Sequence, residues 1–132
     1  MSHPHEQIVR RVYEHLNRGD VGGVIELCDE GLVMDFSERV FNPDRYEGPE
    51  GIRRFYEGVL EIWQSYRWEV EQTRVAGDSV IALLHCHAEG RQGGPPVDWR
   101  VAWLWRFRDG RPVFLRFYRE RAKALEAVGL EA

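Results

Sequence analysis

The chain has 132 residues, of which 43% are hydrophobic and 30% charged, and its formal net charge is −4. This length suits one hydrophobic core and not two, so we expect a single domain over residues 1–132. No apolar run approaches the roughly 18–20 residues of a membrane span, and the first residues lack a signal-peptide core, so we expect a cytoplasmic protein without membrane contacts. The acidic balance argues against nucleic acid as a partner.

Apolar residues at helical spacing predict three helices in the first half of the chain. The first carries its apolar side chains from Ile8 to Leu16 on one face. Asp20 is suited to cap a second, shorter helix, and Pro49 is suited to the first turn of a third. In chain order we predict a helix at 6–17, a helix at 20–28, a strand at 32–37, a loop at 38–43, a short strand at 45–47 and a helix at 49–63.

From Tyr66 onward the hydrophobic period changes to two residues, which is typical of strands. Strands are predicted at 66–76 and 80–90 and in a long hairpin at 97–118, and a short helix is predicted at 121–128. Because the strands follow one another through short connections, we expect an antiparallel meander. Helices first and strands later predict an α+β domain in which the helices pack on one face of a bent sheet.

The hairpin at 97–118 carries three of the five tryptophans and an Asp109-Gly110 pair, which is a strong signal for a hairpin turn. A two-residue type I′ turn would place Trp103 opposite Arg116 and mix apolar and charged groups on both faces. A three-residue loop with a bulge would place Trp103 opposite Leu115. We favour the second register because it gathers the apolar side chains on one face. These are Trp99, Val101, Trp103, Trp105, Phe107, Val113, Leu115 and Phe117.

Three titratable side chains in the predicted strands are candidates for acid/base chemistry. If Asp35 faces an aromatic pocket, burial raises the pKa of its carboxyl and makes it suitable for proton abstraction. If Met34 and Phe36 face inward instead, Asp35 lies at the surface. His85 and His87 share one face of their strand, and they line the cavity, form half of a metal site or lie on the outer face. Spacing identifies no third ligand, so we predict no metal.

Other polar side chains have both a functional and a structural interpretation. Tyr13 is suited to donate a hydrogen bond to a substrate carbonyl, but a tyrosine on an apolar stripe is also a common core residue. Arg119 falls at the mouth of the apolar face, where it binds a carboxylate or extends into water. Cys28 and Cys86 lack metal or redox spacing, so we expect two buried, reduced thiols.

Five phrases of the sequence, together with the order of its elements, resemble a known family. They are LNRGD (16–20), MDFS (34–37), YEGPEGIRRFY (46–56), RFRDGRPV (106–113) and FYRERAKALEAVGL (117–130). They resemble the SnoaL-like branch of the nuclear transport factor 2-like superfamily over nearly the whole chain. The resemblance implies a cone-shaped α+β fold with a strongly bent mixed sheet wrapped around three helices and a short C-terminal helix. It also implies a pocket between the third helix and the concave sheet, no cofactor and often a homodimer.

Most catalytic residues of ketosteroid isomerases are not matched in this chain. When the sequences are aligned through LNRGD, the oxyanion-hole tyrosine of those enzymes falls on Val12. Their base aspartate falls on Phe36, and their protonated aspartate falls near Trp103. Only Tyr56 matches, as a supporting tyrosine on the third helix. The resemblance therefore argues against steroid isomerase chemistry, which needs a base and two donors.

Two other enzyme types of the superfamily place an aspartate near the end of the last strand. The water-activating aspartate of epoxide hydrolases falls on Phe117, so that mechanism lacks its base here. The acid/base aspartate of SnoaL-like cyclases falls within one residue of Glu120. Glu120 is therefore a fourth acid/base candidate, and a residue that caps the following helix is the alternative interpretation.

Two hypotheses follow for function, and fold alone does not decide between them. The first is a cofactor-free enzyme that resembles polyketide cyclases and isomerases and acts by acid/base catalysis on a hydrophobic carbonyl compound. The second is a noncatalytic dimeric binding or interaction module whose pocket is filled by side chains. The catalytic candidates are Asp35, His85, His87 and Glu120. The predicted binding residues are Tyr13, Phe36, Tyr56, Trp63, Trp99, Trp103, Phe117 and Arg119.

A homodimer is expected through the outer face of the sheet. The side chains of that face are still partly apolar in the favoured register, and an apolar face of this kind needs cover. The residues concerned are Ala102, Leu104, Phe114 and Tyr118.

Overall fold

The computed structural model describes residues 3–39 and 43–131. The first half contains helices α1 (Pro4–Asn17) and α2 (Val21–Leu27), strands β1 (Val33–Asp35) and β2 (Arg45–Glu47), and helix α3 (Gly48–Ile62). The second half contains strands β3 (Trp63–Ala76), β4 (Ser79–Gly90), β5 (Val97–Arg108) and β6 (Arg111–Tyr118), and helix α4 (Arg121–Ala127). Each helix and strand predicted from the sequence is present, and residues 40–42 of the predicted loop lie outside the described residues.

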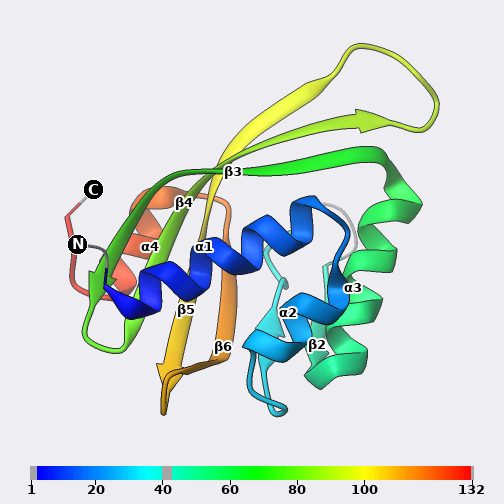
Figure 1. Ribbon diagram of the computed structural model, residues 1–132. Coiled ribbons are helices and arrows are strands. Elements are labelled where there is room, and N and C mark those ends of the chain that lie inside the picture. The colour runs from blue at the N-terminus through cyan, green and yellow to red at the C-terminus, as the bar shows by residue number, and fades with distance from the viewer. Residues whose placement is uncertain (1–2, 40–42, 132) are drawn as a thin grey trace.

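The six strands of the described chain form one mixed sheet in the order β2-β1-β6-β5-β4-β3. Strands β3 to β6 pair antiparallel with their neighbours in sequence, which confirms the predicted meander. Strand β1 pairs parallel with β6, with Met34 opposite Leu115, and antiparallel with β2. The sheet is strongly bent and open, and helices α1 to α3 pack on its concave face, as the cone-shaped fold requires (Figure 1).

Local sequence signals account for the helix ends. The side chain of Asp20 accepts a hydrogen bond from the backbone N–H of Gly23 at 3.0 Å and so caps α2. Pro49 occupies the first turn of α3, where a missing N–H costs nothing. The side chain of Asn17, at the end of α1, makes two 2.8 Å hydrogen bonds with the backbone N–H and carbonyl of Trp68. This pair of bonds joins α1 to the middle of β3.

The β5–β6 hairpin differs from the register that the sequence favoured. Asp109 and Gly110 form a two-residue turn with φ values of 51° and 78°, and Arg108 lies opposite Arg111. The three-residue loop was therefore wrong, because two positive φ angles suit the twist of a type I′ turn. A bulge between Pro112 and Phe114 then shifts the pairing by one residue, so that Trp103 lies opposite Phe117. The bulge returns the apolar side chains to one face as predicted, except Val113, which is the bulged residue and has no paired residue on β5.

Helix α4 packs on the convex face of the sheet, opposite to α1, α2 and α3 (Figure 1). Its Ala124 and Leu125 are buried against Ala102, Leu104 and other side chains of β4 to β6. The apolar part of the outer face, which motivated the predicted homodimer, is therefore covered within the chain. In the described ranges, no helix combines the length and the apolar character needed to cross a membrane.

Candidate functional site

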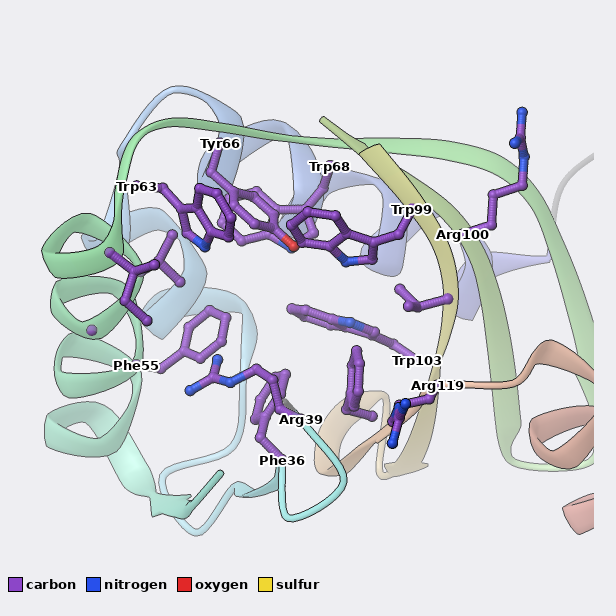
Figure 2. Close-up of a pocket in the computed structure, with 15 residues that line it drawn as sticks. Phe36, Arg39, Phe55, Trp63, Tyr66, Trp68, Trp99, Arg100, Trp103 and Arg119 are labelled. Atoms are coloured by element: carbon purple, nitrogen blue, oxygen red, sulfur yellow. The ribbon is translucent and has the colours of Figure 1, made fainter. Parts of the chain in front are cut away.

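A cavity of about 350 Å³ lies between α3 and the concave face of β3, β5 and β6 (Figure 2). Its volume falls in the range of small-molecule sites. The cavity is open, so the aromatic side chains do not fill the interior of the cone. Its walls are formed by Phe36, Arg39, Phe55, Gly58, Val59, Ile62, Trp63, Tyr66, Trp68, Trp99, Arg100, Val101, Trp103, Phe117 and Arg119.

Two groups of aromatic rings form opposite walls of the cavity (Figure 2). In one group, the ring centroids of Trp63 and Trp99 are 5.5 Å apart and those of Tyr66 and Trp68 are 4.4 Å apart. In the other, Phe36 is stacked on Phe55 at 4.7 Å. Trp103 packs edge-on against Phe36 at 5.1 Å and projects toward the centre of the cavity. These rings offer flat apolar surfaces to a ring-shaped ligand.

The charged side chains on the cavity wall are all arginines among the described residues. The Arg39 guanidinium lies 4.9 Å from the centroid of the Phe36 ring and donates a 3.0 Å hydrogen bond to the hydroxyl of Tyr46. Arg119 approaches the same space from the end of β6 (Figure 2). Arg100 borders the cavity, but its guanidinium points away from it and donates to Glu71 with an Nε–Oε1 distance of 3.3 Å. The cavity therefore combines apolar walls with positive charge.

Tyr66 supplies the one hydroxyl group among the described residues of the cavity wall. Burial raises the pKa of its phenol well above the ordinary value, and the Cys86 thiol beside it adds to this effect. Burial also raises the pKa of the Cys86 thiol to about 11 and that of the Cys28 thiol to about 12. Tyr66 is therefore a neutral hydrogen-bond donor at physiological pH, and both cysteines are buried, reduced thiols as predicted.

Asp35 lies outside the cavity. Met34 and Phe36 are buried, so the side chain of Asp35 points to the other face of β1, where its Oδ1 accepts a 3.0 Å hydrogen bond from the backbone of Ser37. Partial burial acts to raise the pKa of the Asp35 carboxyl, but hydrogen bonds from Ser37 and the charges of Arg116 and Arg45 outweigh it and lower the pKa. The raised pKa expected of a pocket carboxylate is absent because the side chain faces away from the aromatic walls.

His85 and His87 also lie away from the cavity, on the convex face of the sheet, because the buried Cys86 between them points inward. His87 Nε2 lies 2.9 Å from Glu69 Oε1, and His85 Nε2 lies 2.5 Å from Asp98 Oδ2. These hydrogen bonds are the main causes that lower the pKa values of the Glu69 and Asp98 carboxyls. The two histidines thus belong to a polar cluster on the outer face.

Glu120 is exposed and precedes the first residue of α4, without a side-chain hydrogen bond to the helix. The next residue, Arg121, points elsewhere and contacts Glu71 at 2.5 Å and the carbonyl of Leu84 at 2.8 Å. The four acid/base candidates therefore do not meet at one place. Their catalytic role stays a prediction, and the described residues of the cavity wall include no carboxylate and no imidazole.

Six of the eight predicted binding residues line the cavity: Phe36, Trp63, Trp99, Trp103, Phe117 and Arg119. Tyr13 is instead a core residue whose hydroxyl accepts a 3.0 Å hydrogen bond from Trp105 Nε1. Tyr56 lies on the side of α3 that faces Gly19, in the turn between α1 and α2. The three positions on which the resemblance placed catalytic aspartates of relatives, Phe36, Trp103 and Phe117, meet in one apolar wall.

Sequence reasoning missed several residues of the cavity wall. Tyr66 and Trp68 alternate on β3, and their period of two was a usable signal that they share the inner face. Phe55 lies at helical spacing from Ile52 and Val59 on the buried side of α3, a pattern that marks an apolar face but not a wall of the site. No sequence pattern pointed to Arg39. It lies in an irregular loop, where the direction of a side chain cannot be inferred from hydrophobic periodicity.

Comparison with known proteins gives one family and many similar folds. The SnoaL-like domain model matches residues 9–114. No curated protein matches this chain. An NTF2-like protein of unknown function from Burkholderia pseudomallei has a similar structure, with a TM-score of 0.79 and 20% identity over 98% of this chain and 99% of that chain.

Two further similar structures contain small molecules. TerC, co-crystallised with polyporic acid, has a TM-score of 0.80 and 15% identity over 96% of this chain and 98% of its own. Rv0760c from Mycobacterium tuberculosis, in complex with estradiol-17β-hemisuccinate, has a TM-score of 0.75 and 19% identity over 90% of this chain and 95% of its own. At these identities the likeness concerns the fold alone.

Proposed function

The chain belongs to the SnoaL-like domain family, and we propose that its cavity binds a hydrophobic ring compound that carries a negative charge. The observation that carries this proposal is the composition of the cavity wall. Aromatic rings surround the space, two arginines reach it, and the described wall residues include no carboxylate.

The size and apolarity of the cavity support a small organic ligand. A space of about 350 Å³ accommodates a molecule of a few fused or linked rings. A ligand ring that packs against Trp103, Trp99 or Phe55 removes apolar surface from water. This burial contributes roughly 25 cal/mol of binding free energy per Å². Most of the binding free energy should therefore come from ring contacts.

The arginines supply selectivity for a negative charge. A guanidinium binds a carboxylate or an enolate oxygen with charge-assisted hydrogen bonds, which contribute about 1.5–3 kcal/mol each. Arg119 is exposed, so water and salt screen its contribution more strongly than that of the half-buried Arg39. Two structural neighbours support this ligand class, because both polyporic acid and estradiol-17β-hemisuccinate combine an apolar ring system with an acidic group.

Intrinsic fluorescence tests the proposal, because four of the five tryptophans line the cavity. Estradiol-17β-hemisuccinate and uncharged estradiol form a matched pair of probes. We expect both to quench the fluorescence, and we expect the charged probe to bind about 10-fold more tightly or better. In the double variant Arg39→Gln/Arg119→Gln, the two affinities should become similar.

Arg10→Gln is the matched control, since Arg10 is exposed on α1 and does not border the cavity. This variant should keep the preference for the charged probe. Equal binding of the two probes to the wild-type protein would contradict the proposed charge selectivity. A preference that survives in the double variant would show that other groups cause it.

Acid/base catalysis on a hydrophobic carbonyl compound is the second candidate function, and Tyr66 favours it. A neutral phenol in an apolar cavity can donate a hydrogen bond to a carbonyl oxygen and stabilise the charge that develops on it. A base must then come from outside the described wall residues, from Asp35, His85, His87 or Glu120 after a rearrangement, or from the ligand itself. For this reason we rank catalysis below binding.

A bound 2-naphthol probe tests this second candidate, because its absorption reports its ionisation state. If Tyr66 stabilises an oxyanion, the pKa of the bound naphthol should fall, and Tyr66→Phe should restore its solution value. An unchanged pKa in the wild-type protein would remove the support for an electrophilic role. Once a substrate is known, full turnover by an Asp35→Asn/Glu120→Gln variant would exclude those two residues as the base.

The predicted homodimer stays a prediction. Because α4 covers the apolar part of the outer face, a dimer through this face would use the polar part formed by β3, β4 and β5. We expect such a dimer to weaken in high salt, since charge pairs across it are screened. Sedimentation at micromolar concentration and low salt measures the assembly, and a monomer there would contradict the prediction.

A further inference from the structure

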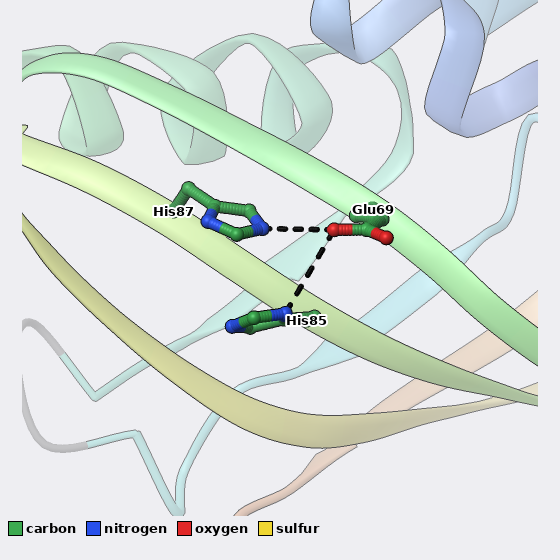
Figure 3. A group of neighbouring side chains, drawn as sticks. All are labelled: Glu69, His85 and His87. Atoms are coloured by element: carbon green, nitrogen blue, oxygen red, sulfur yellow. Dashed lines mark hydrogen bonds and ion pairs between the residues drawn. The ribbon is translucent and has the colours of Figure 1, made fainter.

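Three potential metal ligands meet on the convex face of the sheet (Figure 3). Glu69 lies on β3, and His85 and His87 lie on β4. Glu69 Oε1 is 2.9 Å from His87 Nε2 and 3.8 Å from His85 Nδ1. One ligand atom from each residue lies within 4.8 Å of the other two. In the part of the chain that the structure describes, this is the one group of histidine, cysteine or acidic residues with such spacing.

The pairing of β3 with β4 creates this group. Glu69 lies directly opposite His85, and Arg67 lies opposite His87, so the carboxylate of Glu69 reaches both imidazoles on the same face. The two histidines are adjacent on that face because strand side chains alternate. The sequence shows only two of the three ligands, since the third is 16 residues away from His85 by numbering and becomes a neighbour only through the register.

The separations fit a transition-metal ion with small side-chain adjustments. Zinc binds imidazole nitrogen and carboxylate oxygen at about 2.0–2.2 Å, so ligand atoms around a tetrahedral ion lie about 3.4 Å apart. The observed separations of 2.9 and 3.8 Å lie on either side of this value. Rotations about the side-chain bonds of Glu69 and His85 change both separations toward this value, and the third separation, between the two histidines, lies within 4.8 Å.

Asp98 positions the imidazole of His85 for this role. Its Oδ2 lies 2.5 Å from His85 Nε2, on the side of the ring away from Glu69. When the Nε2–H of His85 donates a hydrogen bond to Asp98, Nδ1 carries the lone pair, which is directed toward the Glu69 side. A carboxylate that orients a histidine ligand in this way is a common feature of zinc sites.

We propose that Glu69, His85 and His87 bind a divalent transition-metal ion of the zinc class, with Asp98 as a positioning residue. Three protein ligands leave a fourth position for water, as in zinc sites that remain open. Two imidazoles and one carboxylate favour zinc, cobalt, nickel or copper over magnesium or calcium, which prefer oxygen ligands.

The surroundings of the site affect its affinity. The carboxylates of Glu69 and Asp98 attract a cation, and the nearby guanidinium groups of Arg67 and Arg100 oppose it. In the single chain His85 is mostly buried, whereas His87 and Glu69 are partly exposed, so an ion can enter from solvent when no second chain covers this face. The site lies on the opposite face of the sheet from the cavity, so it does not depend on the proposed ligand.

Calorimetric titration with Zn²⁺ in a buffer that does not chelate metals tests the proposal. We expect one ion to bind per chain, with a rise in the unfolding temperature. Titration with Co²⁺ should give the visible absorption of a four-coordinate ion with nitrogen and oxygen ligands. The double variant His85→Gln/His87→Gln should lose both signals, and Glu69→Gln, which keeps the shape of the side chain, should weaken binding at least 10-fold.

Asp98→Asn tests the positioning role, and we expect it to weaken Zn²⁺ binding about 10- to 100-fold while the stoichiometry stays at one. His15→Gln is the matched control. His15 Nδ1 pairs with Asp20 Oδ2 at 2.9 Å, the same separation as in the His87–Glu69 pair, but His15 belongs to no three-ligand group among the residues that the structure describes. This variant should bind Zn²⁺ like the wild-type protein.

Two results would overturn the proposal. One is the absence of Zn²⁺ and Co²⁺ binding to the folded wild-type protein at millimolar metal. The other is wild-type affinity in the folded Glu69→Gln and His85→Gln/His87→Gln variants, which would place the ion elsewhere. Circular dichroism establishes that each variant is folded, so a loss of structure is not mistaken for a loss of ligands.

Discussion

Phe36 shows how a single residue defines the character of the site. Its ring lies against Phe55, Trp103 and Phe117, with centroid distances of 4.7, 5.1 and 5.9 Å. The resemblance to ketosteroid isomerases places their catalytic base at this position, where a phenylalanine can only offer an apolar surface. Phe36 thus supplies the wall with a flat face for a ring-shaped ligand and with no group that takes up a proton.

Replacement of Phe36 by alanine should reduce both stability and ligand binding. The side chain is 1% exposed, and truncation of a buried phenylalanine costs about 3–5 kcal/mol of unfolding free energy. Urea unfolding measures this loss. Leu60→Ala is a suitable control, because Leu60 is 37% exposed and should cost less than about 1 kcal/mol. Similar losses in both variants would show that Phe36 is not part of a well-packed wall.

At the scale of elements, the connection between α1 and β3 holds the helices against the sheet. The side-chain amide of Asn17 donates a hydrogen bond to the carbonyl of Trp68 and accepts one from the N–H of the same residue. These are the two bonds that a neighbouring strand would make with Trp68. Trp68 itself lines the cavity. A polar side chain at a helix end therefore fixes the position of an aromatic ring in the site.

Asn17→Ala should lower the free energy of unfolding by about 1–2 kcal/mol, because two backbone groups of Trp68 lose their partner and depend on water. Asn17→Asp keeps the acceptor but turns the donor into a second acceptor that faces a carbonyl. We therefore expect it to be at least as destabilising at neutral pH. Thermal unfolding measures both variants, and a neutral effect of Asn17→Asp would contradict the assigned hydrogen bonds.

At the scale of the whole molecule, surface carboxylates connect distant segments. Glu6 accepts a hydrogen bond from Thr73, Glu69 from His87, Glu71 from Arg121 and Asp98 from His85, and Asp20 accepts a local one from the backbone of Gly23. For each of these carboxyls the hydrogen bond is the largest cause of a lowered pKa. The links join α1 to β3, β3 to α4, and β4 to both of its neighbouring strands.

These links predict that the protein loses stability in acid. The ordinary pKa values are 4.5 for Glu6 and 3.8 for Asp98, and the folded values are lower. As the pH falls below about 4.5, the unfolded chain therefore takes up protons before the folded chain does, and the stabilisation present above this pH is lost. Urea unfolding at a series of pH values should show a midpoint that falls between about pH 4.5 and 3. A constant midpoint over this range would contradict the prediction.

Much of the molecule could be predicted from its sequence. Apolar periodicity located the helices and strands, because the period of each element is a property of its own residues. It also assigned Trp99, Trp103 and Phe117 to one face, even though the hairpin register was wrong. Beyond the bulge, Trp103 lies opposite Phe117 and not Leu115, an offset of two residues from the favoured register, and an even offset leaves each side chain on its face.

The acid/base candidates show where such reasoning ends. Each was a titratable residue in a plausible element, but the direction of Asp35 depended on the parity of a three-residue strand, and that of His85 and His87 on which face of the sheet the helices cover. Arg39 reaches the cavity from a loop without any period. No local pattern contains this information.

The sequence by itself determined the elements, the family and the aromatic character of the inner face, because these follow from the residue types and their spacing along the chain. The tertiary structure decided what the residues do together. The bend of the sheet and the position of α3 left an open cavity instead of a filled core. The pairing of β3 with β4 brought Glu69 to two histidines on the outer face, because strand register joins residues that no short-range pattern relates.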